Sequence, residues 1–270
     1  MGYSQGGSVA LATQYYIEKY DSDDRLRLKG SLCGDGPYDP FATYSRYAKD
    51  DYQLYLPSVI TLILRGYLYY YKDTYLKGFT VEDYLKPEVI AALKNGTDNV
   101  WNMIDSKEKS TTDIDTVIKN AVGEKDSAHI PVSKMLTEKA MDPNSDAYKA
   151  LKKALDANNI TDPTKWAGGK NKKTIAAMHW KCDEVVPYKN YEFLKNNLTI
   201  NDKDWNPTEK TVIEAIDAFL RTFGISDALK DVTELFDNEP KVSNGSHSAA
   251  GKLFFAGNIF YRQDYKHLND

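Results

Sequence analysis

A five-residue pattern at residues 2–6, Gly-Tyr-Ser-Gln-Gly, constrains the fold of this chain more than any other feature of its sequence. It has the form G-x-S-x-G, in which a serine lies on a strained turn between a strand and a helix and the flanking glycines remove side chains that would clash. The residues after Gly6 carry apolar side chains at helical spacing, as such a turn requires. A pattern this short also arises by chance, so its meaning depends on partners elsewhere in the chain.

Two further segments have strand character. Leucines alternate with polar residues over 25–33, ahead of a turn that begins at Gly34, and a second run rich in apolar residues covers 173–180. A loop follows this second strand, and a helix is expected after Pro187. Strands that alternate with loops and helices predict an α/β fold.

The segment 40–170 has an almost entirely helical pattern without strand alternation, so we expect a helical insertion outside the sheet. Its expected features are a helix over 59–71 after Pro57, a capping box at Thr80–Asp83, a helix from Pro87 to Gly96, and helices over 112–122, 131–141 and 145–157. Residues 1–39 and 171–270 are then the α/β core. In its last part we expect helices over 208–223 and 248–261, while 230–243 fits either a short helix or a last strand.

Composition excludes some classes of function. The chain has 39 acidic and 35 basic residues, which gives no electrostatic reason to expect a nucleic-acid partner. Its apolar runs fall far short of the roughly 20 residues that a membrane-spanning helix needs, and no signal sequence is visible at the start. The 20 tyrosines suit wet pockets that contact sugar or lipid.

Catalysis by Ser4 needs a base to take its proton and an acid to orient that base. Asp183 lies in the loop after the second strand, and His247 lies in a loop ahead of the last expected helix. Taken singly, Asp183 also fits a solvated loop carboxylate, and His247 a helix cap or a surface histidine. Their order Ser, Asp, His is the order found in one large class of serine hydrolases.

Four blocks of this sequence, GYSQGG, CGDGPYDP, HWKCDEVVPY and SHSAAG, resemble those of α/β-hydrolase esterases and secretory lipases with a helical lid. The resemblance implies the C-terminal part of an α/β-hydrolase fold, with an incomplete, mostly parallel sheet and 40–170 as lid. It implies that Ser4 is the nucleophile, Asp183 the acid and His247 the base, with the backbone N–H of Gln5 in the oxyanion hole. One departure is the 64 residues between Asp183 and His247, which leaves Asp35 as an alternative acid.

Other residues near these blocks have plainer expected roles. The resemblance implies that His179 shapes the end of its strand. Cys33 and Cys182 would follow neighbouring strands, so either a bridge or two buried free thiols fits them. We expect the four N-x-Ser/Thr triplets, which begin at Asn95, Asn159, Asn197 and Asn244, to be accidental, because a glycan on Asn244 would crowd His247; this fits a bacterial source.

The resemblance also places several strands ahead of the serine turn, where this chain has only Met1. We therefore expect the chain alone to be weak or inactive and to expose sheet surface that self-association or a complementing chain would cover. An internal methionine read as a start codon and a natural split protein are both open explanations. For a longer parent, the resemblance favours a secreted or periplasmic location.

The function expected from these residues is hydrolysis of carboxylic esters, of lipid or of acylated carbohydrate, through an acyl-enzyme on Ser4. Nothing in the sequence calls for a metal or an organic cofactor. A serine peptidase on the same scaffold and a non-catalytic or truncated hydrolase-like module remain the alternatives. The tyrosine-rich stretch 67–71 fits either a lid surface or, as we favour, a buried helix face.

Overall fold

The computed structural model describes residues 1–49, 52–94, 111–180 and 183–200, together with His247, Gly251 and Phe254. The chain divides into two compact units. The first contains residues 1–39 and the described residues from 160 on, and the second contains residues 40–159. Each unit has its own hydrophobic core.

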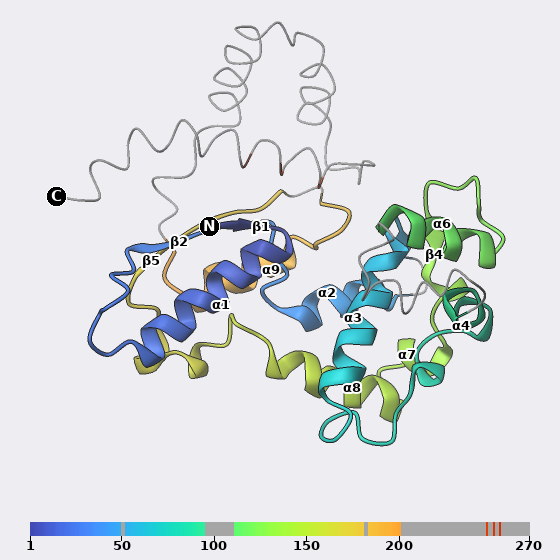
Figure 1. Ribbon diagram of the computed structural model, residues 1–270, viewed down its shortest axis with the longest axis horizontal. Coiled ribbons are helices and arrows are strands. Elements are labelled where there is room, and N and C mark those ends of the chain that lie inside the picture. Colours follow the sequence, from blue (N-terminus) through green and yellow to red (C-terminus); the bar gives the residue numbers. More distant parts are fainter. Residues whose placement is uncertain are drawn as a thin grey trace, which may run out of the picture. The chain divides into compact units, whose positions relative to one another are not determined.

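A parallel three-stranded sheet organises the first unit (Figure 1). Its strands are β1 (Gly2–Tyr3), β2 (Gly30–Gly34) and β5 (Thr174–Met178), in the order β1-β2-β5. The register pairs Cys33 with Gly2 on one side and with Ala177 on the other. The α/β fold class expected from the sequence is confirmed.

Both faces of this sheet are buried. The helices α1 (Gln5–Tyr20) and α9 (Lys189–Asn197) supply apolar side chains to one face. Successive residues of β2 and β5 point to opposite faces, as strand geometry requires. One cluster contains Leu11, Tyr15, Cys33, Ile175, Ala177 and Leu194, and the other contains Leu32, Ala176 and Phe254 with Tyr3 and Met178. Burial of both faces is typical of parallel strands.

The strand expected over 25–33 is shorter than its leucine pattern indicates. β2 begins only at Gly30, because β5 pairs with residues 30–34 alone. Arg27 has a left-handed backbone, with φ of 47°, which a strand does not accommodate, and Leu26 is 66% exposed. The strand expected over 173–180 is confirmed as β5, and the helix expected after Pro187 is confirmed as α9.

The second unit consists mainly of helices. They are α2 (Pro40–Tyr47), α3 (Pro57–Tyr70), α4 (Pro87–Lys94), α6 (Thr111–Ala121), α7 (Glu138–Met141) and α8 (Asp146–Ala157), with single 3-10 turns η1 (Val81–Asp83) and η2 (Val132–Lys134). The capping box at Thr80 is confirmed, because Asp83 accepts a hydrogen bond from the Thr80 N–H. The helix expected over 131–141 is wrong at its start, because β4 (Ile130–Pro131) pairs antiparallel with β3 (Gln53–Leu54) and α7 begins only at Glu138. This short pair lies outside the three-stranded sheet. Strands of two residues are too short for alternation to reveal.

Apolar helix faces and tyrosines form the core of the second unit. Its buried tyrosines Tyr44 and Tyr84 donate to the carbonyls of Ala140 and Ala147 at 2.7 and 3.1 Å. Part of the stretch 67–71 is a buried helix face and part is exposed surface, the two roles expected for it. Its residues 67, 68 and 71 pack against the core, whereas residues 69 and 70 are 68% and 79% exposed.

Some expected elements lie outside the described residues. These are the helix over 208–223, the segment 230–243, Gly96 and most of the helix over 248–261, of which the described Gly251 and Phe254 are helical. Within the described part of the chain, no helix combines the length and the apolar character needed to cross a lipid bilayer.

Candidate active site

Ser4 lies on a strained turn between β1 and α1. β1 ends at Tyr3, α1 begins at Gln5, and Ser4 between them has φ of 55° and ψ of −128°. A residue with a side chain adopts such a conformation only where its surroundings enforce it, and such strain is concentrated at functional sites. Here the Ser4 N–H donates to the Gly34 carbonyl at 2.8 Å, which fixes the turn to the end of β2.

The glycines around this turn differ in how tightly they are packed. A Cβ at Gly2 would lie 2.0 Å from the Gly6 carbonyl oxygen, so position 2 excludes any side chain. A Cβ at Gly6 would meet no described atom within 4 Å, whereas one at Gly7 would lie 2.7 Å from the Gly34 carbonyl oxygen. The expectation that both glycines of the pattern prevent a clash is therefore right for Gly2 and wrong for Gly6. The second close approach is at Gly7, where α1 packs on β2.

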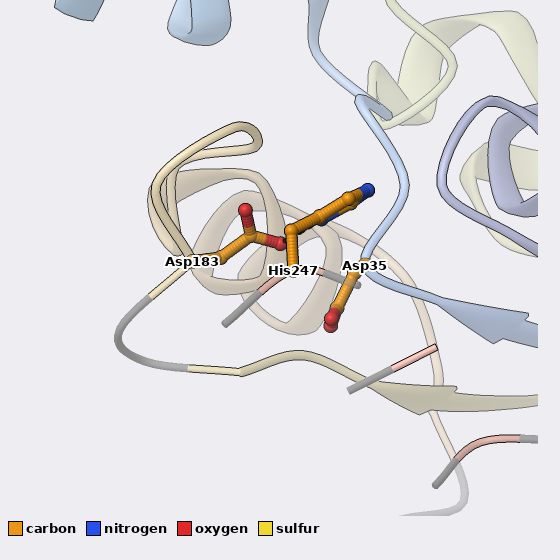
Figure 2. A group of neighbouring side chains, drawn as sticks. All are labelled: Asp35, Asp183 and His247. Atoms are coloured by element: carbon orange, nitrogen blue, oxygen red, sulfur yellow. Dashed lines mark hydrogen bonds and ion pairs between the residues drawn. The ribbon is translucent and has the colours of Figure 1, made fainter. Parts of the chain in front are cut away.

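The candidate residues gather at the carboxyl edge of the sheet. Ser4 directly follows β1, Asp35 directly follows β2, and Asp183 lies in the loop after β5. Because the three strands are parallel, their carboxyl ends share one edge, which is where open α/β sheets place their ligands. Figure 2 shows Asp183 and Asp35 on either side of His247.

His247 joins two of these residues by hydrogen bonds. Its Nε2 lies 2.8 Å from the Ser4 hydroxyl oxygen, and its Nδ1 lies 2.5 Å from Asp183 Oδ2. The other oxygen of Asp183 accepts the backbone N–H groups of Val185 and Val186 at 2.8 and 2.7 Å. With Nδ1–H donating to the carboxylate, Nε2 is free to accept the serine proton.

The electrostatics of this site favour a charged imidazole. Burial acts to lower the pKa of His247, but the hydrogen bond and charge of Asp183, with the charges of Asp35 and Glu184, outweigh it and raise the pKa above its ordinary value. An imidazole with a raised pKa takes a proton more readily, as a general base must.

Asp35 occupies a different position from Asp183. It is fully buried; one of its oxygens accepts the Trp180 N–H at 2.8 Å, and the other lies in a hydrogen bond with the Tyr3 hydroxyl at 2.7 Å. Burial, opposed by His179 and reinforced by the charge of Asp183, raises the pKa of this carboxyl. The carboxylate bonded to His247 is thus Asp183, whereas Asp35 is bonded to Tyr3, whose hydroxyl also bonds to the His247 carbonyl.

His179 directly follows β5 and is buried beside both carboxyl groups. Its Nε2 lies 2.9 Å from the Val186 carbonyl oxygen, and because a carbonyl only accepts, this nitrogen carries a proton. Its Nδ1 and Nε2 lie 4.0 Å from Asp35 and Asp183 respectively. The contact with Val186 ties the strand end to the loop that carries Asp183, a structural role of the kind expected for it.

The sequence reasoning missed two residues that hold the main chain of His247. The Tyr3 hydroxyl donates to the His247 carbonyl, and Glu184 accepts the His247 N–H at 3.0 Å. Each missed residue directly adjoins an expected one, Tyr3 before Ser4 and Glu184 after Asp183. Adjacency was the only signal available, because both contacts join residues far apart in the chain.

Gln5 is the first residue of α1, where backbone N–H groups have no carbonyl of a preceding turn to bond.

The donor atoms of Asp35, Asp183 and His247 all lie within 4.8 Å of one another, close enough to surround a cation. Each of these side chains already makes hydrogen bonds to protein groups, so the cluster is explained without an ion.

Cys33 is a free, buried thiol near the same edge. Burial raises its pKa to about 11, although contact with the Ser31 hydroxyl opposes the shift. Its proposed partner in a bridge, Cys182, lies outside the described residues.

No protein-family profile and no curated protein sequence matches this chain. Its structure is similar to crystal structures of the rice cell wall degrading esterase LipA from Xanthomonas oryzae. A single-residue variant of that esterase matches with a TM-score of 0.54 and 18% identity, covering 82% of this chain and 56% of LipA. A second structure matches with a TM-score of 0.51 and 18% identity, covering 86% and 57%.

The chain therefore spans little more than half the length of the esterase that it resembles. At this level of identity the likeness concerns the fold, and it confirms the expected α/β-hydrolase fold for the part that the chain covers.

Proposed function

We propose that this chain carries the catalytic residues of a serine esterase, with Ser4 as nucleophile, His247 as base and Asp183 as the acid that orients the base. The observation that carries this proposal is the unbroken hydrogen-bond path from Asp183 through His247 to Ser4. The strained backbone of Ser4 supports it, because the turn presents the hydroxyl at the carboxyl edge of the sheet. The fold shared with LipA also supports an ester as substrate.

In this mechanism Nε2 of His247 takes the proton of the Ser4 hydroxyl while the serine oxygen attacks the ester carbonyl carbon. The tetrahedral intermediate collapses as the C–O bond to the alcohol breaks, and the alcohol leaves with the proton from the imidazolium. Water then repeats the sequence on the acyl-enzyme. His247 takes a proton from the water as the water oxygen bonds to the acyl carbon. The imidazolium returns that proton to the serine oxygen as the acyl–serine bond breaks, which releases the carboxylic acid and restores the serine.

The oxyanion of each intermediate needs donors that are in place before the reaction. We assign one of them to the backbone N–H of Gln5, which follows the nucleophile at the start of α1. The positive end of the α1 dipole adds to it, since this helix has 16 residues.

We propose esters of lipid or of acylated carbohydrate as the substrate class, and the helical segment of residues 40–170 as the lid. Tyr69 and Tyr70, which are exposed on α3, are candidates for the surface of this lid.

The test measures hydrolysis of p-nitrophenyl esters of increasing acyl length by the purified chain, with Ser4→Ala as control. We expect turnover that Ser4→Ala removes. A folded chain that hydrolyses none of these esters, or one whose turnover survives Ser4→Ala, would overturn the proposal in favour of a non-catalytic module or a different nucleophile.

A further inference from the structure

The Tyr3 hydroxyl lies between two hydrogen-bond acceptors. One is Asp35 Oδ2, at 2.7 Å, and the other is the carbonyl oxygen of His247. A phenol has one proton, and the His247 carbonyl only accepts. If Asp35 were ionised, the two acceptors would compete for the one proton of this buried hydroxyl.

The neighbouring Asp183 carboxyl influences whether Asp35 holds a proton. Both oxygens of Asp183 lie in hydrogen bonds, one with the backbone N–H groups at 185 and 186 and the other with His247. Asp35 lies within 4.8 Å of it and is fully buried. Two carboxyl groups this close and this dry do not ionise together, because each negative charge disfavours the other.

We propose that Asp35 keeps its proton and donates it in a hydrogen bond to the Tyr3 oxygen, so that Tyr3 in turn donates to the His247 carbonyl and holds the base over Ser4. Asp35 and Tyr3 are then positioning residues. Their effect on catalysis rests on the proposed esterase function, whereas the protonation of Asp35 does not.

Other titratable groups face Asp35 and bear on its charge. Besides Tyr3, Asp183 and His247, these include His179, whose Nδ1 lies 4.0 Å away and has no hydrogen-bond partner among the described residues. A charged His179 would favour an ionised Asp35, and this is the rival arrangement. Burial, the largest influence on Asp35, acts in the opposite direction and raises its pKa.

The packing of Tyr3 makes it a rigid link between nucleophile and base. It is bonded covalently to Ser4, and its ring lies 5.1 Å from the His247 ring and 5.5 Å from the Phe254 ring between centroids. A Cβ at Gly251 would lie 2.7 Å from the Tyr3 ring, so only a glycine leaves room for it there. Glu184 accepts the N–H of His247 and Tyr3 bonds to its carbonyl, so both contacts hold the main chain that carries the imidazole.

A neutral Asp35 also suits the chemistry of the base. Asp183 then remains the carboxylate that contacts the imidazole, and one of the negative charges that raise the pKa of His247 is withdrawn. The hydrogen bond and charge of Asp183, which act most strongly to raise the pKa of His247, are retained.

Infrared difference spectroscopy between the wild-type chain and Asp35→Asn tests the protonation directly and requires no activity. Asn suits the site because it tolerates the left-handed backbone that Asp35 adopts, with φ of 40°. We expect the carbonyl stretch of a protonated carboxylic acid at pH 7 in the wild type and its absence in the variant. A wild-type spectrum without this band would overturn the proposal and indicate an ionised Asp35 paired with His179.

The positioning role is tested by the rate at which a fluorophosphonate probe labels Ser4. We expect Tyr3→Phe to slow labelling about tenfold, as the loss of one buried hydrogen bond implies. We expect Asp35→Ala to slow it likewise, and Asp35→Asn, which still donates to Tyr3, to restore the rate lost in Asp35→Ala. The matched control is Tyr16→Phe, because Tyr16 is 56% exposed and remote from His247 in the chain.

If Asp35→Asn labels as slowly as Asp35→Ala while the pH dependence of labelling shifts, the site needs an ionised Asp35 and the proposal is wrong. A wild-type chain that shows the infrared band but does not label at Ser4 would instead overturn the esterase function and leave the protonation of Asp35 established. The two failures are thus distinguishable.

Discussion

The two compact units of this chain bury tyrosine hydroxyls in different ways. In the helical unit, Tyr44 and Tyr84 each donate to one backbone carbonyl of another helical segment. In the α/β unit, Tyr3 is in contact with both a buried carboxyl group and the carbonyl of the candidate base. In the helical unit, the hydrogen bond only satisfies a polar group inside an apolar core. In the α/β unit, the Tyr3 hydroxyl connects a titratable carboxyl group with the main chain of the candidate base.

This difference shows how burial serves stability in one unit and chemistry in the other. Burial raises the pKa of the Tyr44 hydroxyl, with smaller contributions from Tyr84 and Tyr148, and a neutral donor is all that this position requires. At the carboxyl edge of the sheet, burial acts on Asp35 and His247 as well, and there the charges of neighbouring groups decide which of them holds a proton.

The largest effect that we predict concerns the orientation of the base. Asp183→Asn keeps the shape of the side chain but removes the carboxylate that fixes Nδ1–H, so the imidazole adopts the wrong tautomer. We expect the rate of ester hydrolysis to fall by about 10³ to 10⁴. Stopped-flow or steady-state assays with a p-nitrophenyl ester measure this, and a loss of less than tenfold would show that Asp183 does not orient the base.

The next effect concerns the turn that carries Ser4. Gly2→Ala places a Cβ 2.0 Å from the Gly6 carbonyl oxygen, and we expect a loss of about 1–3 kcal/mol in the free energy of unfolding from this overpacking. Gly6→Ala is the matched control, because its Cβ meets no described atom within 4 Å and alanine favours the helix by up to about 1 kcal/mol. Urea unfolding of both variants checks this, and equal losses would contradict the packing described for the turn.

The sequence predicted which side chains meet at this candidate site better than it predicted the residues that hold them in place. The order of Ser4, Asp183 and His247, together with strands that end just before the first two, indicated their meeting at one edge of a parallel sheet. Tyr3 and Glu184 were missed because both form hydrogen bonds with the His247 backbone, more than 60 positions away, and local sequence patterns do not reveal such contacts.

In the fold, too, some features follow from the sequence pattern and others do not. Helices with long apolar faces, such as α1, α3 and α8, follow from periodicity alone. The extent of β2 did not, because the neighbouring strand decides which residues pair, and the two-residue strands β3 and β4 carry no periodic signal.

The pH dependence of the reaction provides a smaller test. The base acts only when its imidazole is neutral, and the pKa of His247 is raised. We therefore expect the rate to fall as the pH decreases through a value above the ordinary histidine pKa of about 6.5, by tenfold for each further pH unit. A rate profile for the wild type measures it, and a midpoint below the ordinary value would contradict the electrostatics described here.

The same shift affects stability in the opposite sense. Because the folded-state pKa of His247 is raised, its contribution to the free energy of unfolding is fully present below the unfolded pKa and is lost as the pH rises through the folded value.

The smallest effect separates the two kinds of tyrosine. Tyr44→Phe leaves the Ala140 carbonyl without its donor, and we expect a loss of about 1–2 kcal/mol in the free energy of unfolding and no change in probe labelling. Tyr3→Phe should slow labelling at a similar or smaller cost in stability. Urea unfolding and labelling rates of both variants, measured side by side, check this. If Tyr44→Phe slowed labelling as much as Tyr3→Phe, the two kinds of tyrosine would not differ in function.

The central claim is that His247 activates Ser4 for attack, and the most direct measurement is peptide mapping by mass spectrometry after fluorophosphonate treatment. We predict one adduct, on the peptide that contains Ser4, in the wild-type chain, and its loss in a folded His247→Gln variant. A folded wild-type chain without an adduct on Ser4, or an adduct that forms equally fast in His247→Gln, would contradict the account.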